Sequence, residues 1–147
     1  MVASITIYTD GAARGNPGPS ASGYSIYKGR ELLNRECKYN GKMTNNSAEY
    51  TAIIMALSWC GDNLITSENL QIELYSDSEL VIRQLKGRYK VKSKDMKRLH
   101  DEVLELVEEF DSVSFDNLPR SNPNISKVDK MLNELLDTEE EKTSAKE

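Results

Sequence analysis

The sequence is short of the residues on which several protein classes depend. Only two of its 147 residues are cysteines and one is a histidine, and no C-x-x-C spacing occurs. Two thiols cannot hold a chain of this length together with disulfides, and no cluster of cysteine and histidine indicates a zinc site. We therefore expect Cys37 and Cys60 to be reduced thiols in a cytoplasmic protein.

Long apolar segments are missing as well. No apolar run approaches the roughly 20 residues that cross a bilayer, and the N-terminus lacks the basic, apolar and small-residue order of a signal peptide. We expect no membrane partner. The hydrophobic fraction of 38% and the charged fraction of 29% are ordinary for one globular domain, which we expect to be a monomer.

Excess positive charge is also absent, because the net charge is −5. That balance argues against nucleic-acid binding driven by bulk charge. Residues 86–98 nevertheless contain seven lysines and arginines and one acid. A basic stripe of this kind can contact phosphates. It is also typical of a solvated loop and helix face, and charge alone favours this second interpretation.

Hydrophobic periodicity predicts nine elements in the order β-β-β-α-β-α-α-β-α. The predicted strands are 3–10, 20–28, 31–40, 70–76 and a last one around Val113 and Phe115. The predicted helices are 45–61, 78–86, one from the N-cap Ser93 to Phe110, and one beginning at Asn124 or Ser126. Residues 11–19, with three glycines and two prolines, are expected to form a loop. This order indicates an α/β fold, in which an antiparallel meander continues into strands that alternate with helices.

Apolar residues become scarce after Thr138, and residues 134–147 contain six acids and two lysines. We expect one domain over residues 1–137 and an acidic, disordered tail over residues 138–147.

Four acidic residues lie where surface acids are unusual. Asp10 and Asp77 each end a predicted strand, and ligand sites form at the carboxyl ends of strands in such sheets. Glu49 and Asp129 lie on or beside the apolar stripe of their helices. Each acid alone has an ordinary explanation, such as a turn, a helix cap, or the capping box of Asn46 and Glu49. Together they predict a cluster that needs cations, and oxygen ligands select Mg²⁺ or Mn²⁺.

Three segments match a known family: TDGAARGNPGPSASGYSI from Thr9, TNNSAEYTAIIMAL from Thr44 and YSDSELVIRQL from Tyr75. They resemble type 1 ribonuclease H, and the likeness extends from about residue 3 to residue 137. It implies a ribonuclease H-like fold, with a five-stranded mixed sheet flanked by helices. The family's four catalytic and metal-binding acids correspond by this resemblance to Asp10, Glu49, Asp77 and Asp129.

Two features depart from the family pattern. The stretch before the fourth acid is longer than usual, and Val128 stands where relatives carry alanine. Many relatives also carry a histidine in the loop before this acid, whereas the single histidine, His100, lies within the predicted helix ending at Phe110. We interpret His100 as the edge of a packed face, so the chain resembles short members without the loop histidine.

The resemblance implies an enzyme that hydrolyses the RNA strand of RNA–DNA hybrids, leaving 5′-phosphate and 3′-hydroxyl ends. Two Mg²⁺ ions, with Mn²⁺ as substitute, would activate a water and stabilise the departing 3′ oxygen. By the same resemblance the substrate contacts are the backbone of Gly11, Ala12 and Ala13 and the side chains of Asn16, Asn45 and Asn46. The basic stripe adds four candidate phosphate contacts, which are Lys86, Arg88, Lys90 and Lys92.

Two alternative functions stay open. The altered stretch before Asp129 would suit a ribonuclease H-like module that binds nucleic acid without cutting it. A reduced substrate-gripping surface would suit a nuclease that also cuts duplex RNA.

Overall fold

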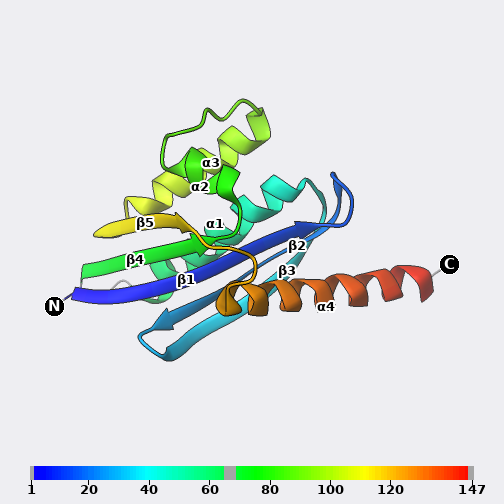
Figure 1. The fold of residues 1–147 in the computed structure, drawn as a ribbon, viewed down its shortest axis with the longest axis horizontal. Coiled ribbons are helices and arrows are strands. Elements are labelled where there is room, and N and C mark those ends of the chain that lie inside the picture. Colours follow the sequence, from blue (N-terminus) through cyan, green and yellow to red (C-terminus); the bar gives the residue numbers. More distant parts are fainter. Residues whose placement is uncertain (1, 65–68, 146–147) are drawn as a thin grey trace.

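The computed structural model describes residues 2–64 and 69–145, and a five-stranded sheet of order β3-β2-β1-β4-β5 lies at its centre (Figure 1). The strands are β1 (Val2–Ala13), β2 (Gly18–Lys28), β3 (Glu31–Met43), β4 (Asn69–Ser76) and β5 (Ser112–Asn117). The helices are α1 (Asn45–Asn63), α2 (Glu79–Leu85), α3 (Lys94–Val107) and α4 (Pro123–Ala145). Strands β1 to β3 are antiparallel, whereas β4 is parallel to β1 and to β5. The predicted mixed sheet is confirmed.

The two faces of the sheet are covered by different helices (Figure 1). Helices α1 and α3 cover one face, where Ile7 of β1 and Leu57 of α1 belong to the larger apolar cluster. Helix α4 covers part of the other face, where Val128 and Leu132 pack around Ala21 of β2. Within the described ranges, no helix is long and apolar enough to span a membrane.

Strand β1 continues beyond the end that we predicted. Its pairing with β2 runs as far as Ala13 opposite Ser20, so residues 11–13 are strand and not loop. The glycine in this segment suggested a turn, but long-range pairing with β2 keeps the backbone extended.

The helix starts also differ from the prediction in two places. Thr44, and not Asn46, caps α1, and its side chain accepts a hydrogen bond from the Ser47 backbone N–H. Helix α4 begins at Pro123. Asn122 Oδ1 accepts hydrogen bonds from the backbone N–H groups of Asn124 and Ile125. The predicted N-cap Ser93 is confirmed for α3, although that helix ends at Val107.

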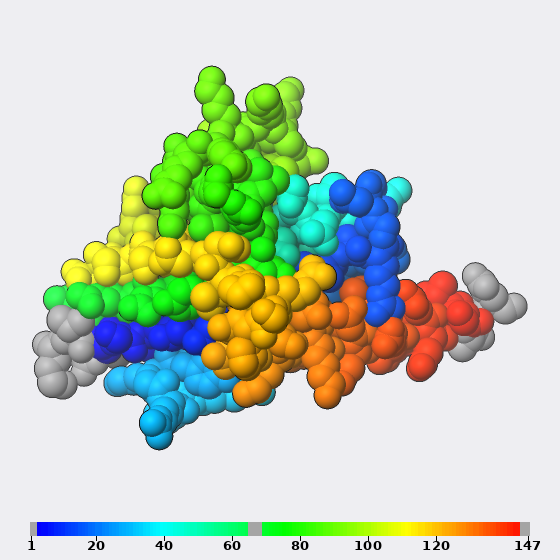
Figure 2. Space-filling model, in the orientation of Figure 1, coloured from blue at the N-terminus to red at the C-terminus, as the bar shows by residue number. Residues whose placement is uncertain are grey.

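Helix α4 continues to Ala145, past Thr138, where composition predicts a disordered tail; residues 146–147 lie outside the described part. The C-terminal end of this helix projects beyond the body of the molecule (Figure 2). Arg14 forms ion pairs with Asp137 and Glu140 of α4, which relieves the repulsion among its acids. Helix α4 therefore crosses the boundary that we expected at residue 138.

Strand β1 and helix α1 pack in close backbone contact at Gly11. A Cβ atom placed on Gly11 would lie 2.3 Å from the Ala48 carbonyl carbon and 2.4 Å from the Glu49 nitrogen. Both contacts are with backbone, which cannot move aside as a flexible side chain can. Only glycine fits between β1 and α1 at this position.

Replacement of Gly11 by alanine is therefore expected to push α1 away from β1 and to lower the free energy of unfolding by about 1–3 kcal/mol or more. Urea unfolding followed by circular dichroism measures this change. Gly41→Asn is the matched control, because Gly41 has a φ of 74° and open space around its Cβ position, and asparagine tolerates this conformation. Equal stability of Gly11→Ala and wild type would contradict the packing described here.

Candidate metal centre

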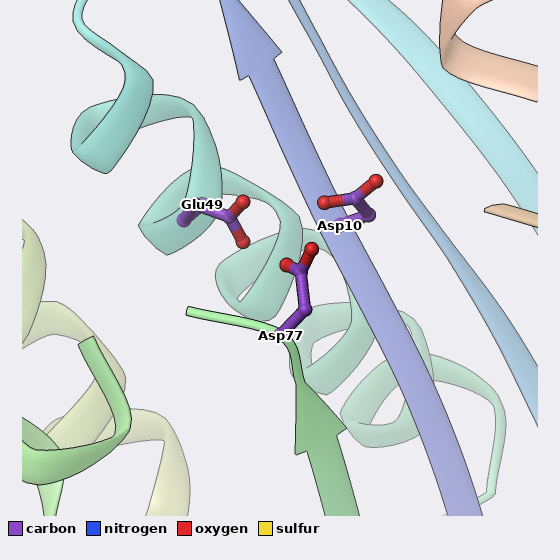
Figure 3. Close-up of side chains that lie close together, drawn as sticks. All are labelled: Asp10, Glu49 and Asp77. Carbon is purple, nitrogen blue, oxygen red and sulfur yellow. The ribbon is translucent and has the colours of Figure 1, made fainter. Parts of the chain in front are cut away.

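Three carboxylates from distant parts of the sequence meet at one edge of the sheet. Asp10 lies in β1, Glu49 in α1, and Asp77 directly after β4. One carboxylate oxygen of each lies within 4.8 Å of those of the other two. Figure 3 shows the three side chains pointing toward one another. The parallel pairing of β1 with β4, which sets Thr9 beside Ser76, brings Asp10 next to Asp77.

Helix α1 is held in place around Glu49 by hydrogen bonds as well as by the contact at Gly11. The Ser22 hydroxyl of β2 donates to the Ala48 carbonyl at 2.6 Å. The Ser76 hydroxyl of β4 donates to Glu49 Oε2 at 3.3 Å. Both neighbouring strands therefore fix the position of the Glu49 carboxylate, which is buried and is not the capping-box partner of Asn46.

Asp10 is the most constrained of these acids, because its side chain is buried and only 1% exposed. Its Oδ1 accepts a hydrogen bond from the Gly11 backbone N–H at 2.9 Å. Its Oδ2 is buried and has no hydrogen-bond partner among the described residues. Burial, followed by the charges of Glu49 and Asp77, raises the pKa of Asp10 to about 11. Burial, followed by the charge of Asp77, raises the pKa of Glu49 to about 8.

The fourth predicted acid, Asp129, lies in α4, close enough to Asp10 for its charge to act there. The charge of Asp129 contributes, after burial and the charges of Glu49 and Asp77, to the raised pKa of Asp10. Asp129 is half-buried and lies outside the compact group of three carboxylates. The structure thus brings all four predicted acids together around Asp10, with Asp129 at the margin.

The family model described as RNase H matches residues 2–118.

The chain belongs to the ribonuclease H family. It is 38% identical over 134 residues to ribonuclease HI of Halobacterium salinarum. The aligned region covers 90% of this chain and 64% of that protein. It is 29% identical over 143 residues to the bifunctional protein Rv2228c of Mycobacterium tuberculosis, covering 96% of this chain and 38% of that protein. The chain therefore spans about two-fifths to two-thirds of the length of these curated relatives.

Solved structures of ribonucleases H have the same fold. The RNase H1 crystal structure from Halobacterium salinarum matches with a TM-score of 0.83 and 36% identity, over 92% of this chain and 98% of that one. The N-terminal RNase H domain of Rv2228c matches with a TM-score of 0.86 and 29% identity, over 96% and 99%. LC11-RNase H1 in complex with an RNA/DNA hybrid matches with a TM-score of 0.80 and 37% identity, over 91% and 97%. The resemblance inferred from the motifs is confirmed.

Arg120 is a residue of this ribonuclease H site to which the sequence analysis assigns no role. It lies in the loop between β5 and α4, and its Nε donates to Asp77 Oδ2 at 3.3 Å. Its side chain is 77% exposed, so the ion pair is weak and leaves the cluster strongly negative. No local pattern in the sequence points to Arg120, because only the fold brings it to Asp77.

The residues expected to contact substrate at the end of β1 lie against the start of α1. The Ala13 N–H donates to Asn45 Oδ1 at 3.2 Å, and the Asn45 N–H donates to Asn16 Oδ1 at 3.0 Å. These two asparagines therefore connect the β1–β2 loop to the helix. The Ala13 N–H already donates a hydrogen bond within the protein. Asn46 is half-exposed beside them. Whether this group binds nucleic acid stays a prediction.

The predicted phosphate contacts lie at the end of α2 and in the segment that joins it to α3. Lys86 forms an ion pair with Asp116 of β5 at 2.8 Å, which uses one of its three N–H donors and partly neutralises its charge. Arg88, Lys90 and Lys92 are exposed. The structure thus leaves these last three cations accessible to a phosphate.

His100 packs as the sequence analysis expects. Its ring lies edge-to-face against Tyr50 with centroids 6.4 Å apart, and its Nδ1 lies 3.2 Å from Asp101 Oδ1.

The raised pKa values make the stability of the metal-free protein depend on pH. The pKa of Asp10 rises from 3.8 to about 11, so the folded protein keeps a proton that the unfolded chain releases above pH 3.8. The free energy of unfolding therefore falls as the pH rises above that value. Asparagine at position 10 has no proton to release, so the Asp10→Asn variant does not lose stability in this way as the pH rises. We expect the metal-free variant to melt more than about 4 °C above wild type near pH 8, with the difference vanishing near pH 4.

Differential scanning calorimetry in a chelator measures this difference. Mn²⁺ should then raise the melting temperature of wild type and not that of Asp10→Asn, because only the wild type offers the full set of carboxylates. An Asp10→Asn protein less stable than wild type near pH 8 would contradict the repulsion described here.

Proposed function

We propose that this chain is a metal-dependent endoribonuclease that hydrolyses the RNA strand of RNA–DNA hybrids. The observation that carries the proposal is the buried Asp10 Oδ2, which lacks a hydrogen-bond partner among the described residues and belongs to a carboxylate next to three others. A buried charged oxygen in such surroundings is costly unless a cation binds it. Membership of the ribonuclease H family supports the same reading.

The residues present fit divalent metal ions. Every donor is a carboxylate oxygen, which suits hard ions such as Mg²⁺ and Mn²⁺. Asp10, Glu49 and Asp77 would hold one ion, and Asp10 with Asp129 would hold a second. Two such ions supply the activation of a water and the stabilisation of a departing 3′ oxygen. Four carboxylates balance the charge of two divalent ions.

The chemistry that follows is direct attack of water on phosphorus. The bond from phosphorus to the 3′ oxygen breaks with its electron pair on that oxygen, the hydroxyl of the water bonds to phosphorus, and the other water proton goes to the 3′ oxygen by way of solvent. The ends are therefore a 5′-phosphate and a 3′-hydroxyl. Asp10 is the carboxylate whose pKa the other three acids all raise, so it is the residue that would contribute to holding both ions. Water is the nucleophile, so no serine, cysteine or lysine is needed, and the role of the carboxylates would be to hold the metal ions.

Recognition of the hybrid would use the surface around the end of β1. Gly11, Ala12 and Ala13 carry at most a methyl group, which permits close approach of a nucleic-acid backbone, and sensing of the 2′-hydroxyl distinguishes RNA from DNA. Asn16, Asn45 and Asn46 lie beside them. The exposed Arg88, Lys90 and Lys92 would contact phosphates. The relative LC11-RNase H1 forms a complex with an RNA/DNA hybrid, which supports this substrate. A monomeric state and a cytoplasmic location stay predictions.

Cleavage of a hybrid with labelled RNA tests the proposal. Asp77→Asn should lower the rate by about 10²–10³-fold or more in Mg²⁺, because one of the charges that position the metal is lost. Asp62→Asn is the matched control, since this exposed acid of α1 undergoes the same chemical change away from the cluster. Undiminished cutting by Asp77→Asn would contradict the assignment.

Two further arms of this experiment distinguish the alternatives. Retention of hybrid without any metal-dependent product identifies a binding module. Equal cleavage of duplex RNA and hybrid in competition identifies a broader nuclease.

A further inference from the structure

Arg14 follows β1 directly and reaches across to α4. Its Nη2 donates to the Asn133 carbonyl at 3.2 Å and to Asn133 Oδ1 at 3.3 Å, and lies 2.7 Å from Asp137 Oδ1. Its Nη1 lies 2.8 Å from Glu140 Oε1. Residues four and three apart lie on one face of a helix, so a single guanidinium spans two turns of α4.

The support behind Arg14 is rigid. Its backbone N–H donates to the Pro19 carbonyl at 2.8 Å, and a Cβ on Gly18 would lie 2.1 Å from the Arg14 carbonyl oxygen. The preceding residue, Ala13, donates its N–H to Asn45 of α1. Arg14 therefore projects from a loop that is fixed to both β2 and α1.

The same contacts lead to the fourth acid. Asn133 Nδ2 donates to the Asp129 carbonyl at 3.0 Å, so Arg14 and Asp129 are bound to the same asparagine. Apolar contacts of Val128 and Leu132 also hold α4 on the sheet. Apolar packing is not directional. It determines which face of α4 lies on the sheet, but it restricts the position of α4 along its own axis less strongly.

We propose that Arg14 is a positioning residue for the acidic cluster, because its bonds to Asn133, Asp137 and Glu140 hold α4 along its axis and keep the Asp129 carboxylate beside Asp10. This inference rests on the proposed function, which is what requires Asp129 in that place. Isolated surface ion pairs contribute little to stability. Arg14 is instead one guanidinium shared by three residues, with its side chain only 29% exposed.

The inference predicts a defect in metal binding that exceeds the loss of stability. For Arg14→Ala, the Kd for the more weakly bound Mn²⁺ ion should rise about tenfold, as should the Mg²⁺ concentration that gives half-maximal hydrolysis. The KM for the hybrid should stay within about twofold, because no contact with substrate is removed. Calorimetric titration of the full chain with MnCl₂ and steady-state kinetics at varied Mg²⁺ measure these quantities.

Two variants make the experiment specific. Lys142→Ala removes another ion pair of α4, with Glu139, and should leave the metal dependence unchanged. Asp137→Ala with Glu140→Ala removes the two acidic partners of Arg14 and should reproduce most of the metal defect. Adding Arg14→Ala to this pair should cause a smaller change than Arg14→Ala alone, because only the bonds to Asn133 are left to break.

Normal metal dependence in Arg14→Ala, with only a lower melting temperature, would overturn the inference while leaving the proposed function intact. If Arg14→Ala does not fold, the metal dependence of the variant with both Asp137→Ala and Glu140→Ala decides in the same way. A wild-type chain that neither binds Mn²⁺ nor cuts hybrid removes the proposed function and this inference together.

Discussion

The buried carboxylate of Asp10 is the constraint on which the rest of this structure depends. Its charge is costly inside the protein, and among the described residues the charges that raise its pKa are those of further acids. Arg120 forms its ion pair with Asp77 from an exposed position, where solvent weakens the attraction of its charge to Asp10 and Asp129. An arrangement so unfavourable for the empty fold is reasonable when a divalent ion supplies the missing positive charge. The cluster therefore lowers the stability of the metal-free fold, and the proposed cation site explains why the acids are gathered there.

The fold produces this cluster through a small number of close contacts. Parallel pairing of β1 with β4 sets Asp10 beside Asp77, and the absence of a side chain on Gly11 lets α1 bring Glu49 to the same point. These three acids thus lie on the rigid centre of the molecule. Asp129 comes from α4, on the other side of the sheet, and its placement depends on contacts made elsewhere along that helix. The packing of α4 therefore determines how close the charge of Asp129 lies to the other three acids.

Much of the site follows from local patterns in the sequence, because Asp10 and Asp77 end predicted strands and Glu49 lies in register with an apolar helical stripe. Long-range contacts explain what these patterns miss. Residues 11–13 look like a loop locally, but pairing with β2 extends the strand. The acids after Thr138 favour disorder by composition, yet Arg14, far away in the sequence, pairs with two acids of the same helix. Arg120 is similar, since only the fold shows its contact with Asp77.

Anomalous diffraction from crystals soaked in Mn²⁺ tests the central claim most directly, because manganese identifies its own position. The account predicts a peak at carboxylate coordination distance from Asp10, shared with Glu49 and Asp77, and a second peak between Asp10 and Asp129 when a hybrid is bound. Absence of manganese at Asp10 in crystals with bound hybrid, with the four side chains ordered, would contradict it.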